Sequence, residues 1–181
     1  FQHEGYECIP NIPLLAMHIL NRTKRIRVGC GFNIILNWHP IRLAEDYAVV
    51  DYLSNGRFTF GIGRGYHSRE VEGFSMPMLD RDANREVFEE QLEIIIKAFN
   101  EDSFAHKGKH YQIPPPGIPY RGYEVKEVTL VPRPHRRPVD IWQPIVTGSK
   151  TGMAFMAKHG VKGVIANVAE HFVKDYVGLY T

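Results

Sequence analysis

Residues 53–66 read Leu-Ser-Asn-Gly-Arg-Phe-Thr-Phe-Gly-Ile-Gly-Arg-Gly-Tyr. Aromatic and β-branched residues make up most of 58–63 and predict a buried strand. The glycine of Ser54-Asn55-Gly56 can take the positive φ that ends a helix, so a helix is predicted just before this strand. The strand runs directly into Arg64-Gly65-Tyr66. Because α/β proteins build their binding sites where strands end, this stretch predicts both the class of the fold and the place of a site.

The rest of the chain continues to alternate between helices and strands. Helices are predicted over residues 13–21, 40–53, 82–99, 150–159 and 169–180, and strands over residues 26–36, 58–63, 139–146 and 163–166. The proline-rich stretch 103–138 interrupts this rhythm with short β-like pieces. Regular alternation indicates an α/β fold with a parallel sheet. A doubly wound sheet fits, and so does an incomplete (β/α)8 barrel, since a complete barrel needs about 250 residues.

The composition is that of a globular protein. Its 181 residues are 44% hydrophobic and carry 22 Lys and Arg against 20 Asp and Glu, a net charge of +2. These values exclude a disordered chain and argue against a nucleic-acid-binding protein. No apolar run approaches the roughly 18 residues of a membrane helix. The two cysteines, Cys8 and Cys30, are too few for a disulfide scaffold or a zinc cluster, so a reducing compartment, the cytoplasm, is expected.

The start of the sequence predicts that the chain is part of a longer polypeptide. The first residues, Phe-Gln-His-Glu-Gly, include no initiator methionine. They also lack the basic and apolar regions of a signal peptide. We therefore expect residues 1–181 to be an internal piece of a larger protein.

The turn at Arg64-Gly65-Tyr66 is the first candidate site. Glycines at a strand end let the backbone approach a ligand closely, and an arginine there can hold a phosphate with two parallel hydrogen bonds. The alternative is a tight turn whose arginine pairs with a carboxylate. The spacing does not match the dinucleotide fingerprint G-x-G-x-x-G, and the next helix is expected to begin many residues later.

Thr147-Gly148-Ser149 is the second candidate, because it follows a strand and opens a helix. Helix N-termini favour anions, and Ser149 could add a hydroxyl; the alternative is a simple serine N-cap. His39 is the third, because it follows a strand end and histidine moves protons near neutral pH. The alternative for His39 is a capping or packing role. No metal site is expected, since His106 and His110 lie in a loop without a suitably spaced acidic partner.

Several segments in combination resemble the luciferase-like flavin monooxygenase family, the bacterial luciferase superfamily. The matching segments are residues 11–13, 23–29, 39–46, 53–58, 60–66, 72–74, 106–111 and 139–142. The most specific part is Leu-Ser-x-Gly-Arg followed by a strand that ends in Gly-x-Gly-Arg-Gly. The family is a (β/α)8 TIM barrel, so the resemblance implies one partial barrel domain over residues 1–181. It would hold strands three to six with their helices, and residues 103–138 would be an insertion after helix 4.

The resemblance implies where a flavin phosphate would bind. In this family the arginine of the Arg-Gly turn holds that phosphate, which corresponds to Arg64, with Gly65 and Tyr66 lining the same place. The turn that opens the fifth helix adds backbone and hydroxyl donors, which corresponds to Gly148 and Ser149.

The resemblance also implies where the flavin ring would lie. The end of the third strand passes beneath the isoalloxazine, often with a non-proline cis peptide, which places Gly31, Phe32 and Asn33 beside the ring. His39 matches a histidine near the substrate side and is the tentative catalytic residue. The histidine pair best tied to the family's chemistry normally precedes the position of Phe1.

The implied activity is that of a two-component monooxygenase. A separate flavin reductase would supply reduced FMN, which would react with O2 to oxidise a small organic substrate, and the barrel would bind the cofactor and exclude water. Two alternatives remain open: a deazaflavin-dependent hydride-transfer enzyme on the same barrel, and a non-catalytic flavin-binding homologue. A homodimer through the helices over 13–21 and 40–53 is expected.

Overall fold

The computed structural model describes residues 9–146 and 149–165. Its main sheet is parallel, and the strands pair in the order β1-β3-β8-β9, with β2 also paired to β3. The strands are β1 (Val28–Gly29), β2 (Asn33–Ile34), β3 (Phe58–Gly63), β8 (Ile141–Ile145) and β9 (Lys162–Ile165). The short strands β1 and β2 both pair with β3, and β3, β8 and β9 then lie side by side in chain order. A barrel is built in this way, whereas a doubly wound sheet reverses its strand order at a switch point.

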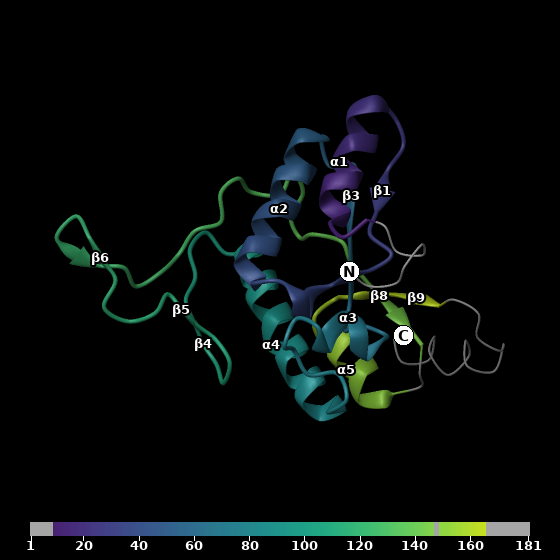
Figure 1. The fold of residues 1–181 in the computed structure, drawn as a ribbon. Helices are drawn as coiled ribbons and strands as arrows, with labels where there is room; N and C mark the ends of the chain where they lie inside the picture. Colours follow the sequence, from purple (N-terminus) through teal and green to yellow (C-terminus); the bar gives the residue numbers. More distant parts are fainter. Residues whose placement is uncertain (1–8, 147–148, 166–181) are drawn as a thin grey trace.

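Helices alternate with the strands, and the second helix packs against both the first and the fourth beside the sheet (Figure 1). They are α1 (Ile12–Arg22), α2 (Pro40–Leu53), α3 (Ser68–Glu72), α4 (Arg81–Asn100) and α5 (Lys150–Lys158), with a 3-10 turn η1 (Ile35–Asn37). Asn11 caps α1 by accepting from Leu14 N, and Asp80 caps α4 by accepting from the amides of Asp82 and Ala83. The predicted helices over 13–21, 40–53, 82–99 and 150–159 are confirmed within a residue or two at each end. The predicted helix over 169–180 lies outside the described residues.

The predicted strand over 26–36 is wrong as one continuous element. The structure breaks it into β1 and β2, and residues 35–37 turn into η1. The peptide bond between Gly31 and Phe32, in the gap between the two strands, is cis. Both short strands still pair with β3 in parallel, so the segment keeps its place in the sheet.

An aromatic cluster joins the sheet to the helix layer. The Tyr47 ring of α2 lies 5.3 Å from the Phe58 ring, 4.8 Å from the Phe60 ring and 5.1 Å from the Phe99 ring. All four side chains are almost fully buried. The Tyr47 hydroxyl donates to the Phe58 carbonyl at 3.2 Å, so its polar atom is satisfied inside the core. Burial of this area is the main force that holds α2 and α4 on the sheet.

The segment 103–138 forms a separate excursion after α4, which projects away from the helices in Figure 1. It contains two small antiparallel hairpins, β4 (His106–Lys107) with β5 (Gln112–Ile113) and β6 (Pro119–Tyr120) with β7 (Tyr123–Glu124). The Glu90 carboxylate of α4 ties the first hairpin down. It accepts from His106 Nε2 at 3.1 Å and from the amides of His110 and Tyr111 at 2.9 and 2.8 Å. The assignment of this segment as an insertion after the fourth helix of a barrel stays a prediction. Within the described part of the chain, no helix is both long and apolar enough to cross a bilayer.

Candidate functional site

Packing at Gly65 and hydrogen bonds from Asn84 hold the turn that follows β3 in place. Gly65 takes φ +94°, and a Cβ at this position would lie 2.2 Å from Val71 Cγ2, so a larger residue does not fit. The side chain of Asn84, on α4, is buried in this place. Its Nδ2 donates to the Arg64 carbonyl at 3.2 Å and to the Pro77 carbonyl at 2.8 Å. The turn is thereby fixed to the start of α4.

A second buried side chain holds the other end of the same turn. The Glu70 carboxylate, on α3, accepts from the backbone amide of Tyr66 and, at 2.7 Å, from that of His67. The Glu70 carbonyl accepts from Asn37 Nδ2 at 2.9 Å, which links α3 to the end of β2 and η1. Glu70 itself is only 6% exposed. Together these bonds position the backbone from which the Arg64 side chain projects.

A cavity of about 400 Å³ opens beside this turn, between the ends of β3 and β8 and the first turns of α4 and α5. This volume is within the usual range for small-molecule sites. The lining residues with charged or polar side chains, apart from aromatic Tyr66, are Arg64, Arg81, Arg85, Glu89, Gln143 and Ser149. Three arginines against one glutamate give the cavity a net charge of +2. A phosphate monoester carries about −1.5 to −2 at pH 7, so the cavity charge matches that group.

The three arginines are close enough to influence one another. Burial, and then the positive charge of Arg85 and of Arg81, lower the pKa of the Arg64 guanidinium, while Glu89 acts in the opposite direction. Burial also raises the pKa of Glu89, against the attraction of Arg85 and Arg64. Like charges gathered in a partly buried cavity are unfavourable unless an anion joins them. The electrostatics therefore favour an anionic ligand.

Two further features of the cavity suit a polar, phosphate-bearing ligand. Ser149 is the N-cap of α5, and its Oγ accepts from Gly152 N at 3.3 Å, so the first turn of this helix faces the cavity. The serine-cap interpretation is thus confirmed, and it is compatible with anion binding at the same helix end. The Gln143 Oε1 atom is buried without a hydrogen-bond partner among the described residues, so it can accept from a ligand hydroxyl. Gly148 lies outside the described residues.

Gly61, before the turn, is needed by the protein's own backbone. A Cβ on Gly61 would lie 1.7 Å from the Cys30 carbonyl oxygen and 3.1 Å from the Phe32 ring. The expectation that glycines in this stretch serve the approach of a ligand is therefore incomplete, because at Gly61 the approaching group is the neighbouring strand.

The residues predicted to lie beside a flavin ring are found next to the same strand. The Gly31–Phe32 peptide is cis, as the family resemblance implied. Asn33 pairs with Ile62 of β3 and is 4% exposed, and its Nδ2 is buried without a partner among the described residues. None of residues 31–33 lines this cavity, so a flavin would have to extend beyond it to reach them.

His39 does not line the cavity. It is the N-cap residue of α2, without a side-chain capping bond, and its ring meets the Tyr111 ring edge-on with centroids 5.9 Å apart. Tyr111 belongs to the excursion, and its hydroxyl accepts from Gln91 Nε2 at 2.7 Å. The predicted capping or packing alternative thus describes the observed contacts of His39 better than contact with the cavity does. Its catalytic role stays a prediction.

Sequence reasoning found Arg64 and Ser149 but missed Arg81, Arg85 and Glu89. These three lie on α4 at i, i+4 and i+8, a spacing that places them on one helical face. The helix was correctly predicted, so its charged positions could have been examined face by face. The sequence does not show which face of α4 lies against the strand ends. Among the described residues, no three His, Cys, Asp or Glu side chains converge as a metal site.

Comparisons with known proteins agree with this architecture. The family model described as luciferase-like monooxygenase matches residues 1–178. The oxygenase component of a flavin-dependent trigonelline monooxygenase from Acinetobacter baylyi is 34% identical over 110 residues, which are 61% of this chain and 30% of that protein.

Solved structures share the fold at low sequence identity. Monooxygenase RslO1 from Streptomyces bottropensis superposes with a TM-score of 0.81 at 23% identity, covering 99% of this chain and 51% of that one. The oxygenating constituent of 3,6-diketocamphane monooxygenase from Pseudomonas putida, solved with FMN, gives 0.72 at 20% identity, covering 99% and 49%. An F420-dependent secondary alcohol dehydrogenase gives 0.67 at 14% identity, covering 99% and 52%. The chain therefore spans about half the length of these structures, and the matched strands form part of a (β/α)8 barrel.

Proposed function

Because the chain belongs to the luciferase-like monooxygenase family, we propose that it is part of a flavin-dependent monooxygenase that uses reduced FMN and O2 to oxidise a small organic substrate. The observation that carries this proposal is the cavity with a net charge of +2 at the ends of β3 and β8. Its volume is that of a small-molecule site, and its charge and helix N-terminus suit the phosphate end of FMN. A neutral or cationic ligand would not offset the repulsion among the three arginines.

The residues of the chain would divide the binding of FMN among them. Arg64, Arg81 and Arg85 would hold the phosphate, with the Ser149 hydroxyl and the first turn of α5 as further donors. Tyr66, which lines the cavity and is 73% exposed, would cover the phosphate from outside, beside Gly65. Gln143 Oε1 would accept from a hydroxyl of the ribityl chain.

The ring would then lie toward residues 31–33, where the buried Asn33 Nδ2 donor has no partner within the described part of the chain. Reduced FMN, when bound, supplies the electrons that activate O2. The protein's part is to orient the ring and to exclude water around it. His39 is kept as the candidate for proton transfer to the substrate, from the side where it meets Tyr111.

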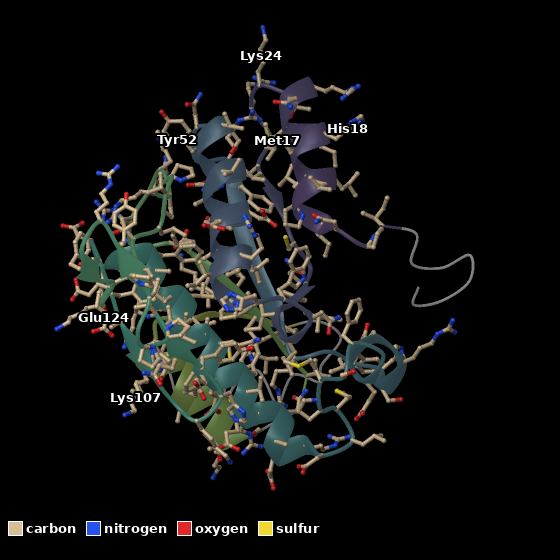
Figure 2. The ribbon with its side chains drawn as sticks, turned by 60° about the vertical axis from the view of Figure 1, so that its left-hand side comes forward. Met17, His18, Lys24, Tyr52, Lys107 and Glu124 are labelled. Carbon is tan, nitrogen blue, oxygen red and sulfur yellow. The ribbon has the colours of Figure 1, made fainter. Side chains whose placement is uncertain are left out.

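Two partners and a compartment are part of the proposal. A separate reductase would supply reduced FMN, a hypothesis supported by the name "oxygenase component" of the Acinetobacter relative. A homodimer would form through α1 and α2, whose outer sides expose Leu14, Tyr52 and Leu53 by 68%, 58% and 56%. Figure 2 shows Tyr52 of α2 and Met17 of α1 at the same end of the molecule. The scarcity of cysteines supports a cytoplasmic location.

A deazaflavin-dependent hydride-transfer reaction is the second candidate. The cavity charge would suit the phosphate-bearing tail of that coenzyme as well, and one structural neighbour carries an F420 adduct. A non-catalytic flavin-binding role is the third, since His39, the tentative catalytic residue, does not line the cavity.

Oxygen uptake separates these candidates. The protein is mixed anaerobically with reduced FMN, then with O2 and a panel of aldehydes, ketones and terpenes, and in parallel with the reduced deazaflavin coenzyme. Substrate-dependent oxygen consumption and an oxygenated product with FMN support the monooxygenase. Turnover with the deazaflavin alone would replace it with hydride transfer, and binding of FMN without any turnover would favour the non-catalytic role.

A further inference from the structure

The three arginines of the cavity, Arg64, Arg81 and Arg85, are like charges carried by two different elements of the fold. Arg64 projects from the turn after β3, whereas Arg81 and Arg85 project from α4, so the three belong to two separate elements. Before a ligand binds, their positive charges repel. Burial is the main cause of the lowered pKa of Arg64, and the charges of Arg85 and Arg81 lower it further. Repulsion between two elements would tend to move them apart unless something joins them.

Asn84 is the direct link between those two elements. It lies on α4 immediately before Arg85, and it is 3% exposed. Its Nδ2 donates to the carbonyl of Arg64 itself at 3.2 Å and to the carbonyl of Pro77 at 2.8 Å. One amide group therefore ties the backbone of the first arginine to the helix that carries the other two, and also fixes the loop that leads into that helix.

Glu70 completes this link from the other side of the turn. Its carboxylate accepts the amides of Tyr66 and His67, the residues that follow Arg64-Gly65. With Gly65 at φ +94°, the backbone from Arg64 to His67 is held at both ends by buried side chains. Neither Asn84 nor Glu70 lines the cavity, so neither is placed to contact the ligand.

We propose that Asn84 and Glu70 are positioning residues that preorganise the three arginines for a terminal phosphate group. They hold Arg64 in register with Arg81 and Arg85 before the ligand arrives, so the ligand does not have to assemble its own site. This inference rests on the proposed phosphate site. It predicts that the loss of Asn84 weakens only that part of the affinity that the phosphate supplies.

The test compares FMN with riboflavin, which is the same ring system without the phosphate. Asn84→Asp keeps the size of the side chain but replaces the Nδ2 donor with an oxygen, which faces the Arg64 and Pro77 carbonyls. Because Asn84→Asp would also add a negative charge near the arginines, the neutral variant Asn84→Leu is measured beside it, and the inference requires both variants to lose FMN affinity. Asn100→Asp is the matched control, because Asn100 is on the same helix and donates its Nδ2 to Ile96 O at 3.0 Å, far along the sequence from the turn. Glu70→Gln keeps an oxygen that can accept the two amides, whereas Glu70→Ala does not.

We expect Asn84→Asp and Glu70→Ala each to raise the Kd for FMN by about fivefold or more, as the loss of one or two buried hydrogen bonds implies. The Kd for riboflavin should stay within about twofold, and Asn100→Asp and Glu70→Gln should behave like the wild type toward both ligands. Inhibition of FMN binding by inorganic phosphate should weaken in parallel.

Each outcome decides between distinct explanations. Equal loss of FMN and riboflavin affinity in Asn84→Asp would mean a general structural role and would overturn the inference. Unchanged FMN affinity in Asn84→Asp, with a protein that still melts cooperatively, would overturn it as well. If the wild type itself binds FMN no more tightly than riboflavin, the proposed phosphate site is wrong, and the positioning role is lost with it.

Discussion

Replacement of Arg64 by alanine removes one of the three cations from the candidate phosphate cavity. The net charge of the lining falls from +2 to +1, because Arg81, Arg85 and Glu89 remain. The Arg64 side chain is half-buried, so its hydrogen bonds to a phosphate would be only partly weakened by water. Hydrogen bonds to charged groups contribute about 1.5–3 kcal/mol, which corresponds to a rise of about 10- to 150-fold in the Kd for reduced FMN.

The assay is an anaerobic titration of the protein with reduced FMN, in which binding is measured by calorimetry or by fluorescence. Arg69→Ala is the matched control, because Arg69 is an exposed arginine on α3, only five positions along the chain, and it does not line the cavity. The loss in Arg64→Ala should shrink as salt is added, since added ions screen the cation–phosphate attraction. An Arg64→Ala protein that binds reduced FMN as tightly as the wild type would refute this reasoning, and so would an equal loss in Arg69→Ala.

Three other perturbations test the structure around the site. Gly61→Ala should lower the free energy of unfolding by about 3 kcal/mol or abolish folding, because its Cβ would lie 1.7 Å from the Cys30 carbonyl oxygen. Gly63→Ala is the control and should cost less than about 1 kcal/mol, because its Cβ meets only Phe32 at 3.5 Å. Similar denaturation curves for the two variants would contradict the close approach at Gly61. Burial raises the pKa of Glu89 above its ordinary value of 4.5, so the folded protein is most stable with this carboxyl neutral, below about pH 4.5, and loses that stability as the pH rises through the raised pKa. In thermal melts, Glu89→Gln should therefore become more stable relative to the wild type as the pH rises. A difference in stability that does not change with pH would contradict the shift. Burial raises the pKa of the Cys30 thiol to about 12, so in a Cys8→Ser background a thiol reagent at pH 8 should react only after unfolding; fast labelling of the folded protein would show that Cys30 is accessible.

Local sequence patterns predicted most of the helices and strands. The apolar face of α4, the proline that opens α2 and the glycine that follows it are short-range signals, and each gave an element close to its observed bounds. The prediction of segment 26–36 as a single strand was wrong because its β-branched composition does not show that it divides into β1 and β2 and then turns into η1. The choice between a barrel and a doubly wound sheet depends on strand order, which no local pattern contains.

The site was predictable only where its residues follow strands. Arg64 and Ser149 stand at strand ends, and the general rule for α/β proteins locates them. Arg85 and Glu89 come from the face of α4 that meets those ends, so they become neighbours of Arg64 only through packing. His39 was singled out by the same strand-end rule, but its ring packs against Tyr111 of the excursion, a contact between residues 72 positions apart in the chain.

The role of Asn84 was not predictable from the sequence either, because it too depends on how the fold packs. A buried asparagine in the first turns of a helix has no sequence signature that separates it from an exposed one. Its importance arises from two carbonyls that the fold brings to it, those of Arg64 and Pro77. Buried polar groups require partners, so once the fold is known such a residue stands out by its burial and its bonds.

The most direct test of the account is the experimental structure of this protein with FMN bound. We expect the phosphate between the guanidinium groups of Arg64, Arg81 and Arg85 and the first turn of α5 at Ser149, with the ring extending toward residues 31–33. A flavin bound elsewhere, or bound with its phosphate in solvent and the arginine cavity empty, would contradict the central claim.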